Sequence, residues 1–259
     1  MLITLAVMFI VLATFALIVV NMISDYTTKR DQDYRTMINH AKNIISDTED
    51  LLLNQAQVSL SKIMLLVLHN RILRCLEKMA EHQKDPISHS NINERILNER
   101  KVINEIKSSY RDDLAFRPPE TDGLALAQLR SIRRLRTILH NEMKMGTIVS
   151  ASDIQAEDRR LYLLVLKVNI SNLISRTLEL RKLKQIGSCR ILVQKGLDVI
   201  RKSNIKDEWI NEKADLLMQL ESGLNEERNE KMRELGKDAG QRAEAKRDMD
   251  EIFGDKKKW

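Results

Sequence analysis

The chain has 259 residues, of which 43% are hydrophobic, 31% are charged and 4% are aromatic, with a formal net charge of +6. Its eight glycines and three prolines are few against the usual ~7% and ~5%, which argues against Gly-rich loops and closely spaced turns. Alternating strand patterns are absent, and the two cysteines, Cys75 and Cys189, define neither a disulfide framework nor a metal spacing. The composition is typical of long helices, so we expect an all-α fold.

The first segment, residues 1–24, contains no charged residue. About 20 apolar residues cross a ~30 Å hydrocarbon core as a helix, so we predict a single transmembrane anchor that contacts the lipid bilayer. A cleaved secretory signal and a buried core helix remain alternatives, although a signal prefers a basic start and only ~7–15 apolar residues. Downstream, Lys29, Arg30 and Arg35 place the long C-terminal part in the cytoplasm by the positive-inside tendency.

After the anchor, apolar residues recur every seven positions. They are Met37, Ile44, Leu51, Val58, Leu65 and Ile72. A period of seven predicts packing against another helix with a left-handed crossing. We therefore expect the anchor to continue directly into one long helix of a bundle or coiled coil, with residues 63–68, which are apolar on every side, deepest in the core.

Two breaks divide the following sequence. At the first, Pro86 interrupts the helix, and Ser90 or Asn91 is expected to cap a new helix. The apolar face of that helix is expected to consist of Ile92, Ile96, Ile103, Ile106, Tyr110 and Leu114. Residues 117–123, Arg-Pro-Pro-Glu-Thr-Asp-Gly, form the strongest break. We predict a long helical hairpin over residues 25–116 and a second helical segment of the bundle over residues 117–224.

Within that second segment we expect a helix that stops at Gly146, and another that begins with a capping box at Ser152 and ends or kinks at Gly187. A turn at Ser203-Asn204 should precede a last helix from about Asp207. Residues 225–259 contain ten Lys/Arg and ten Asp/Glu, which predicts a charged tail, either helical or disordered.

Motifs for chemistry are missing. No Gly-rich phosphate loop, nucleophile signature or metal-ligand spacing around the five histidines is present. We therefore predict no catalytic, cofactor-binding or metal-binding residues and no enzymatic activity.

Basic residues are concentrated between Arg130 and Lys206, where 17 Lys/Arg and six Asp/Glu give a local net charge of +11. The candidate face for an anionic partner consists of Arg130, Arg133, Arg134, Arg136 and Lys144. Three interpretations remain open: an ordinary solvated surface, a face attracted to anionic lipid, and a site for an acidic protein or a nucleic acid. A nucleic acid is disfavoured because Tyr162 is the only aromatic residue in this region.

Together these features predict a single-pass, membrane-anchored helical scaffold or adaptor without catalytic activity. It would position or assemble a protein partner at the membrane, through its helices or by self-association. Two alternatives are a sensory or regulatory helical bundle that transmits a signal from the membrane, and a phage or host-defence membrane effector.

Overall fold

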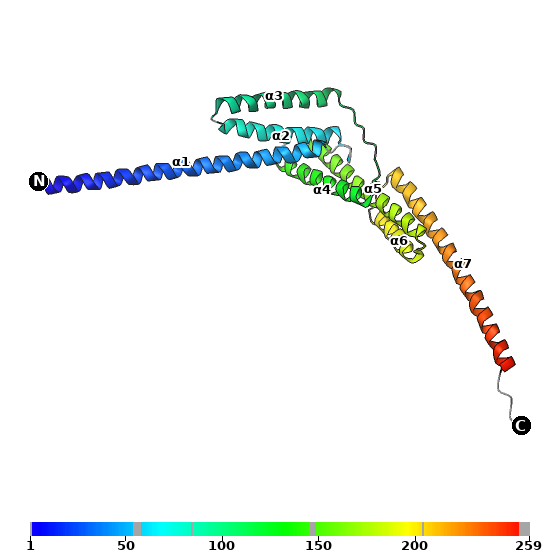
Figure 1. The fold of residues 1–259 in the computed structure, drawn as a ribbon. Helices are drawn as coiled ribbons and strands as arrows, with labels where there is room; N and C mark the ends of the chain where they lie inside the picture. The colour runs from blue at the N-terminus through cyan, green and yellow to red at the C-terminus, as the bar shows by residue number, and fades with distance from the viewer. Residues whose placement is uncertain (1, 54–57, 84, 146–148, 204, 254–259) are drawn as a thin grey trace. The chain divides into compact units, whose positions relative to one another are not determined.

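The computed structural model describes residues 2–53, 58–83, 85–145, 149–203 and 205–253, without the side chains of residues 2–14, 16, 245, 246 and 248–253. The described residues form helices and no strand, which confirms the all-α class (Figure 1). The helices are α1 (Leu2–Leu53), α2 (Lys62–His82), α3 (Pro86–Ser109), α4 (Asp122–Met145), α5 (Ala151–Lys182), α6 (Ile186–Ser203) and α7 (Glu208–Phe253). They divide into two compact units, which we describe separately.

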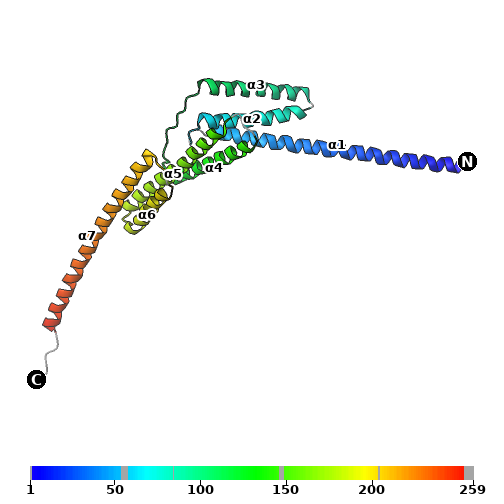
Figure 2. The same ribbon diagram turned by 180° about the vertical axis from the view of Figure 1, so that it is seen from behind.

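The first unit comprises residues 1–116 and 133–158. In it α2 lies between the C-terminal part of α1 and α3, as both views show (Figures 1 and 2). One core cluster joins these three helices through Ala41, Ile45, Ile72, Cys75, Leu76, Met79 and Ile96. Residues 133–158, which we predicted in the second helical segment, belong to this unit. They include the C-terminal part of α4 and the N-terminal part of α5, and the remaining parts of both helices belong to the second unit.

The apolar N-terminal segment does continue directly into one long helix, α1, but the expectation that this helix follows the seven-residue stripe to Ile72 is wrong. Helix α1 ends at Leu53, residues 58–61 are not helical, and α2 begins at Lys62. The hydroxyl of Ser61 caps α2 by accepting a hydrogen bond from the Met64 amide at 3.0 Å. Ile44 of α1 packs against the core cluster that contains Ile72 of α2, so the stripe is the buried face of a helix pair.

The apolar run at residues 63–68 does lie in the core, as predicted. Met64, Val67 and Leu68 are fully buried, and Leu65 is 5% exposed. A stretch that is apolar on several sides needs more than one neighbour, and the first unit supplies them around α2.

Helix α3 begins earlier than predicted. Its cap is Asp85, whose carboxylate accepts a hydrogen bond from the Ser88 amide at 2.9 Å, in place of Ser90 or Asn91. Pro86 fits the first turn because its missing N–H would have no partner there. The predicted apolar face is confirmed at Ile96, Ile103 and Ile106, all of which are buried, and Ile92 packs against the core cluster. The face does not extend to Tyr110 and Leu114, because α3 ends at Ser109 and Leu114 is 38% exposed.

The second unit comprises residues 117–132 and 159–259. Its core joins α6 and α7 through Cys189, Val193, Leu197, Leu217, Leu220 and Leu224. Leu173, Ile174 and Leu180 of α5 are partly buried and pack against this cluster. At Gly196 the three helices approach so closely that an added Cβ would lie 3.0 Å from both Leu173 Cδ2 and Leu217 Cδ1.

In this unit two predicted helix boundaries shift, and one is confirmed. Helix α5 is capped by Ser150, which accepts from the Asp153 amide at 3.2 Å, so the capping box at Ser152 is wrong. Helix α5 ends at Lys182, and Lys184 just beyond it adopts a left-handed backbone conformation (φ 57°). The predicted end at Gly187 is therefore wrong, because Gly187 lies inside the first turn of α6. Asp207 caps α7 as predicted, by accepting from the Ile210 amide.

Beyond Leu224, α7 continues as a helix to Phe253, and its described side chains from Arg228 onward are exposed. The predictions at Gly146 and Asn204 lie outside the described residues.

Candidate functional site

Helix α1 has an apolar stretch that is left exposed by the residues that the structure describes. Its exposed large side chains are Phe15, Leu17, Ile18, Val19, Val20, Met22 and Ile23, each between 38% and 68% exposed. Residues 17–20 are consecutive and therefore face all sides of the helix, because a turn takes 3.6 residues. Every side of this stretch is thus apolar and accessible.

Over the described residues, no helix has an apolar run long enough to cross a membrane. The predicted anchor lies largely outside that description, since the side chains of residues 1–14 and 16 are not described. The anchor over residues 1–24 therefore stays a prediction.

Between the apolar stretch and the first core, α1 is exposed on all sides over residues 24–33. Tyr34 contacts the C-terminal end of α2. Its hydroxyl donates a hydrogen bond to Gln83 Oε1 at 2.6 Å, and its ring stacks on His82 at 6.2 Å between centroids. Residues 24–33 thus form a solvated helical stalk, which contains Lys29 and Arg30.

The five basic residues predicted as one face have different surroundings. Arg130, Arg133 and Lys144 are exposed, while Arg134 is exposed and reaches Asp47 of α1 at 3.2 Å. Arg130 belongs to the second unit, and the other four belong to the first.

Arg136 is partly buried and fastens α4 to α5. Its Nε and Nη2 donate to the two carboxylate oxygens of Asp158 at 2.8 and 3.0 Å. These hydrogen bonds lower the pKa of Asp158 despite its partial burial, and His140 lies 3.7 Å from the same carboxylate. Arg136 therefore serves the fold, which leaves fewer residues for an anionic partner than predicted.

A second charged cluster is buried between α2 and α4. The Glu142 carboxylate, 3% exposed, contacts Arg74 and lies 3.9 Å from Arg71. Among the described residues, Arg71 Nε and Arg74 Nη1 have no hydrogen-bond partner. The arrangement holds two helices together and presents no accessible group to a substrate.

The cysteines do not supply a reactive thiol. Both are free and buried, and burial raises the pKa of the Cys75 and Cys189 thiols above the usual range. A thiol with a raised pKa is a poor nucleophile at neutral pH because the thiolate is the reactive form.

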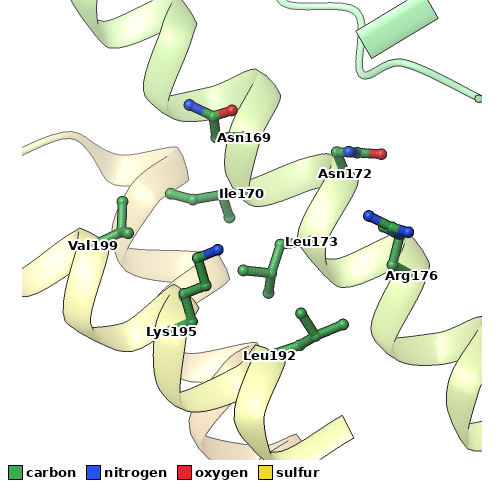
Figure 3. A pocket seen from close by; sticks show the side chains of 9 residues that line it. Asn169, Ile170, Asn172, Leu173, Arg176, Leu192, Lys195 and Val199 are labelled. Atoms are coloured by element: carbon green, nitrogen blue, oxygen red, sulfur yellow. The ribbon is translucent and has the colours of Figure 1, made fainter. Parts of the chain in front are cut away.

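A pocket of about 340 Å³ opens between α5 and α6 in the second unit (Figure 3). Its walls are apolar at Ile170, Leu173, Leu192 and Val199. Its polar lining residues are Asn169, Asn172, Arg176 and Lys195. Of the features described here, this pocket has the geometry best suited to a small ligand.

The sequence did not reveal this pocket, but it contained a signal. Residues 159–206 have twelve Lys/Arg and two Asp/Glu, a net charge of +10, so most of the basic excess lies on α5 and α6 and not on α4. The arginine cluster at residues 130–136 drew attention to α4 because it is the densest group of basic residues in the chain, and its role as a face for an anionic partner stays a prediction.

No three His, Cys, Asp or Glu side chains come together to hold a metal ion within the described part of the chain. The chain matches no family model, no curated protein and no solved structure.

Proposed function

We propose that this protein is a single-pass, membrane-anchored helical scaffold without catalytic activity, which positions a protein partner near the bilayer. The observation that carries the proposal is the stretch from Phe15 to Ile23, apolar and exposed on all sides. A partner helix would cover one side of it, whereas a bilayer covers every side at once. The uncharged sequence of residues 1–24 is long enough for the remainder of a span.

The stalk supports a cytoplasmic position for the helical units. Lys29, Arg30 and Arg35 follow the apolar segment within about 15 residues, and no Lys or Arg precedes it. Lys29 and Arg30 are exposed on the stalk, where they can contact anionic headgroups of the inner leaflet.

The scaffold role is supported by what the helices offer. Two helical cores present long exposed polar faces, and the exposed Arg130, Arg133 and Lys144 are accessible to an acidic partner. No accessible nucleophile or acid–base pair comes with them in the clusters described above. Nucleic acid remains a disfavoured partner because aromatic stacking platforms are scarce in the basic region.

Membrane extraction tests the anchor directly. The double variant Phe15→Arg/Ile18→Arg places two charges in the apolar stretch, and each costs about 2.5–3.5 kcal/mol near the centre of a span. We expect wild type to stay with the membrane fraction in alkaline carbonate, and the variant to move to the supernatant. The matched control Tyr26→Arg, on the exposed stalk, should behave as wild type; wild-type protein in the supernatant would contradict the proposal.

Reporter fusions test the orientation. A reporter that is active only in the cytoplasm, fused after the last residue, should be active, and one that is active only outside should be silent. The opposite pattern, or a mature protein that begins after Ser24, would exclude an anchor with the C-terminal part inside.

A regulatory bundle is the second candidate, because α1 is helical without interruption from Leu2 to Leu53 and so connects the apolar stretch to the first core. Inserting four glycines after Thr28 would break that connection and leave both ends intact. Partner proteins cross-linked to the cytoplasmic part should be unchanged for a scaffold. Their loss on insertion would favour a bundle whose binding depends on the membrane end of α1.

A further inference from the structure

We propose that the pocket between α5 and α6 binds a single-chain anionic amphiphile, a carboxylate with a medium or long alkyl chain. The alkyl chain would lie against the apolar walls, and Lys195 and Arg176 would bind the carboxylate. This inference does not depend on the membrane anchor, because every residue involved belongs to the second unit.

The apolar part of the pocket comes from facing turns of two helices. Ile170 and Leu173 project from α5 toward α6, and Leu192 projects from α6 toward α5 (Figure 3). Gly196 brings α6 close to Leu173 and so closes the pocket floor. Such a surface offers dispersion contacts and burial to a flexible chain of methylene groups.

Two cationic side chains, Lys195 and Arg176, line the same pocket. Lys195 is exposed and has no ion-pair partner among the residues that the structure describes. Arg176 contacts only Asp122 among the ion pairs seen, at 3.5 Å, and both side chains are more than half exposed. An exposed pair of this kind contributes little, so a ligand carboxylate can replace Asp122 at small cost.

The surroundings favour an anion over a neutral or cationic ligand. The net charge of +10 over residues 159–206 raises the local concentration of anions. The amide groups of Asn169 and Asn172 add neutral donors beside the two cations.

The size and lining of the pocket further limit which class of ligand can bind. At about 340 Å³ it is near the lower end of the ~300–1,000 Å³ usual for ligand sites, which suits one alkyl chain better than a two-chain lipid. No Phe, Tyr or Trp lines it, so a nucleobase or a planar cofactor would lack a stacking partner.

The test uses the full-length chain in nanodiscs of zwitterionic lipid. Trp209 packs against the cluster that contains Ile170, so its fluorescence reports on the pocket once Trp259→Phe removes the second tryptophan. Decanoate and dodecanoate are titrated, and the signal of empty nanodiscs is subtracted. We expect saturable binding that tightens roughly fourfold for each added CH₂, and binding of decanol at least tenfold weaker than that of decanoate.

Charge reversal at the rim identifies the site. Lys195→Glu/Arg176→Glu should weaken dodecanoate binding more than tenfold and allow dodecylammonium to bind, with unchanged helicity because both side chains are exposed. Lys195→Arg should retain binding. The single variant Lys195→Glu should also weaken dodecanoate binding. Its matched control Lys202→Glu makes the same single charge reversal on α6 outside the pocket lining and should lower affinity less than threefold.

Several results would overturn the proposal. Equal binding of decanol and decanoate would show that the cations do not recognise the ligand. Equal losses in Lys202→Glu and in the rim variant would reduce the effect to general electrostatic attraction. A signal no larger than that of empty nanodiscs would mean that the pocket does not bind the amphiphile.

Discussion

Buried charge is the most consequential feature at the scale of single residues. Glu142 has lost nearly all contact with water, and a carboxylate in that position is stable only with close counter-charges. Arg74 and Arg71 supply them from α2, although each guanidinium keeps one buried N–H without a partner among the described residues. The cluster is therefore sensitive to the loss of its single negative charge.

We predict that Glu142→Gln destabilises the first unit by about 3–5 kcal/mol, because two largely buried guanidinium groups then lack a counter-charge. Chemical denaturation of the full-length chain in detergent, followed by circular dichroism, measures the change. The matched control Glu77→Gln removes an exposed partner of Arg100 and should cost no more than about 1 kcal/mol. Similar effects of the two substitutions would show that the Glu142 pair is not buried in solution.

Asp158 predicts a pH dependence of stability. Arg136 lowers its pKa in the folded state below the unfolded value of ~3.9. The pair therefore contributes its full stability above that unfolded value, and the contribution is lost as pH falls through the folded pKa. Asp158→Asn should be less stable than wild type at pH 7, and the gap should close as the pH falls below the unfolded value and through the folded pKa.

The control for this pH dependence is Asp198→Asn, which removes an exposed carboxylate 3.9 Å from Arg201. Its melting temperature should follow that of wild type at every pH. A gap between Asp158→Asn and wild type that stays constant down to acid pH would contradict the assignment.

At the scale of helices, a seven-residue period identifies which residues are buried but not where the chain turns. Leu51, Val58, Leu65 and Ile72 are all buried, as the stripe indicates, although α1 ends between the first two. The seven-residue repeat can continue from one helix into the next if the loop between them has a length that keeps the spacing. Periodicity alone therefore cannot place the turn. The local signal was Ser61, a good cap that stands directly before an apolar run.

We predict that Leu51→Asp disrupts the packing of α1 on α2, while Leu53→Asp does not. Leu51 is 6% exposed and Leu53 is 82% exposed, two positions apart on the same helix. An unpartnered buried carboxylate costs more than the ~1.5–3 kcal/mol that leucine burial contributes, so the melting temperature of the first variant should fall sharply. If the two variants melt alike, the stripe is not the buried face.

At the scale of the whole molecule, the sequence was enough to predict the helical class, the strong break at residues 117–123 and the fading apolar face after Leu224. These depend on composition and local pattern. The pocket could not be predicted, because it requires residues of α5 and α6, Arg176 and Lys195 among them, to line one cavity across a hairpin. The pairing of the two helices depends on the left-handed turn at Lys184 and the close approach at Gly196, neither of which has a reliable sequence signature.

The exposed end of α7 gives the last prediction. Core contacts of this helix end at Leu224, Glu227 still pairs with Arg181, and the described side chains from Arg228 onward are exposed. A chain truncated after Arg228 should therefore lose helical circular dichroism in proportion to the residues removed, and its melting temperature should not change. An isolated helix of this kind contributes no buried apolar area to the core.

The control is a truncation after Leu216, which removes Leu217, Leu220 and Leu224 from the core of the second unit and should lower the melting temperature strongly. The truncation after Arg228 could instead lower the melting temperature by an amount that depends on protein concentration, which would contradict the prediction. That result would show that Met232 and Leu235, both more than half exposed in one chain, are buried against a second copy. The exposed helix would then be an assembly surface, and self-association would become part of the scaffold's function.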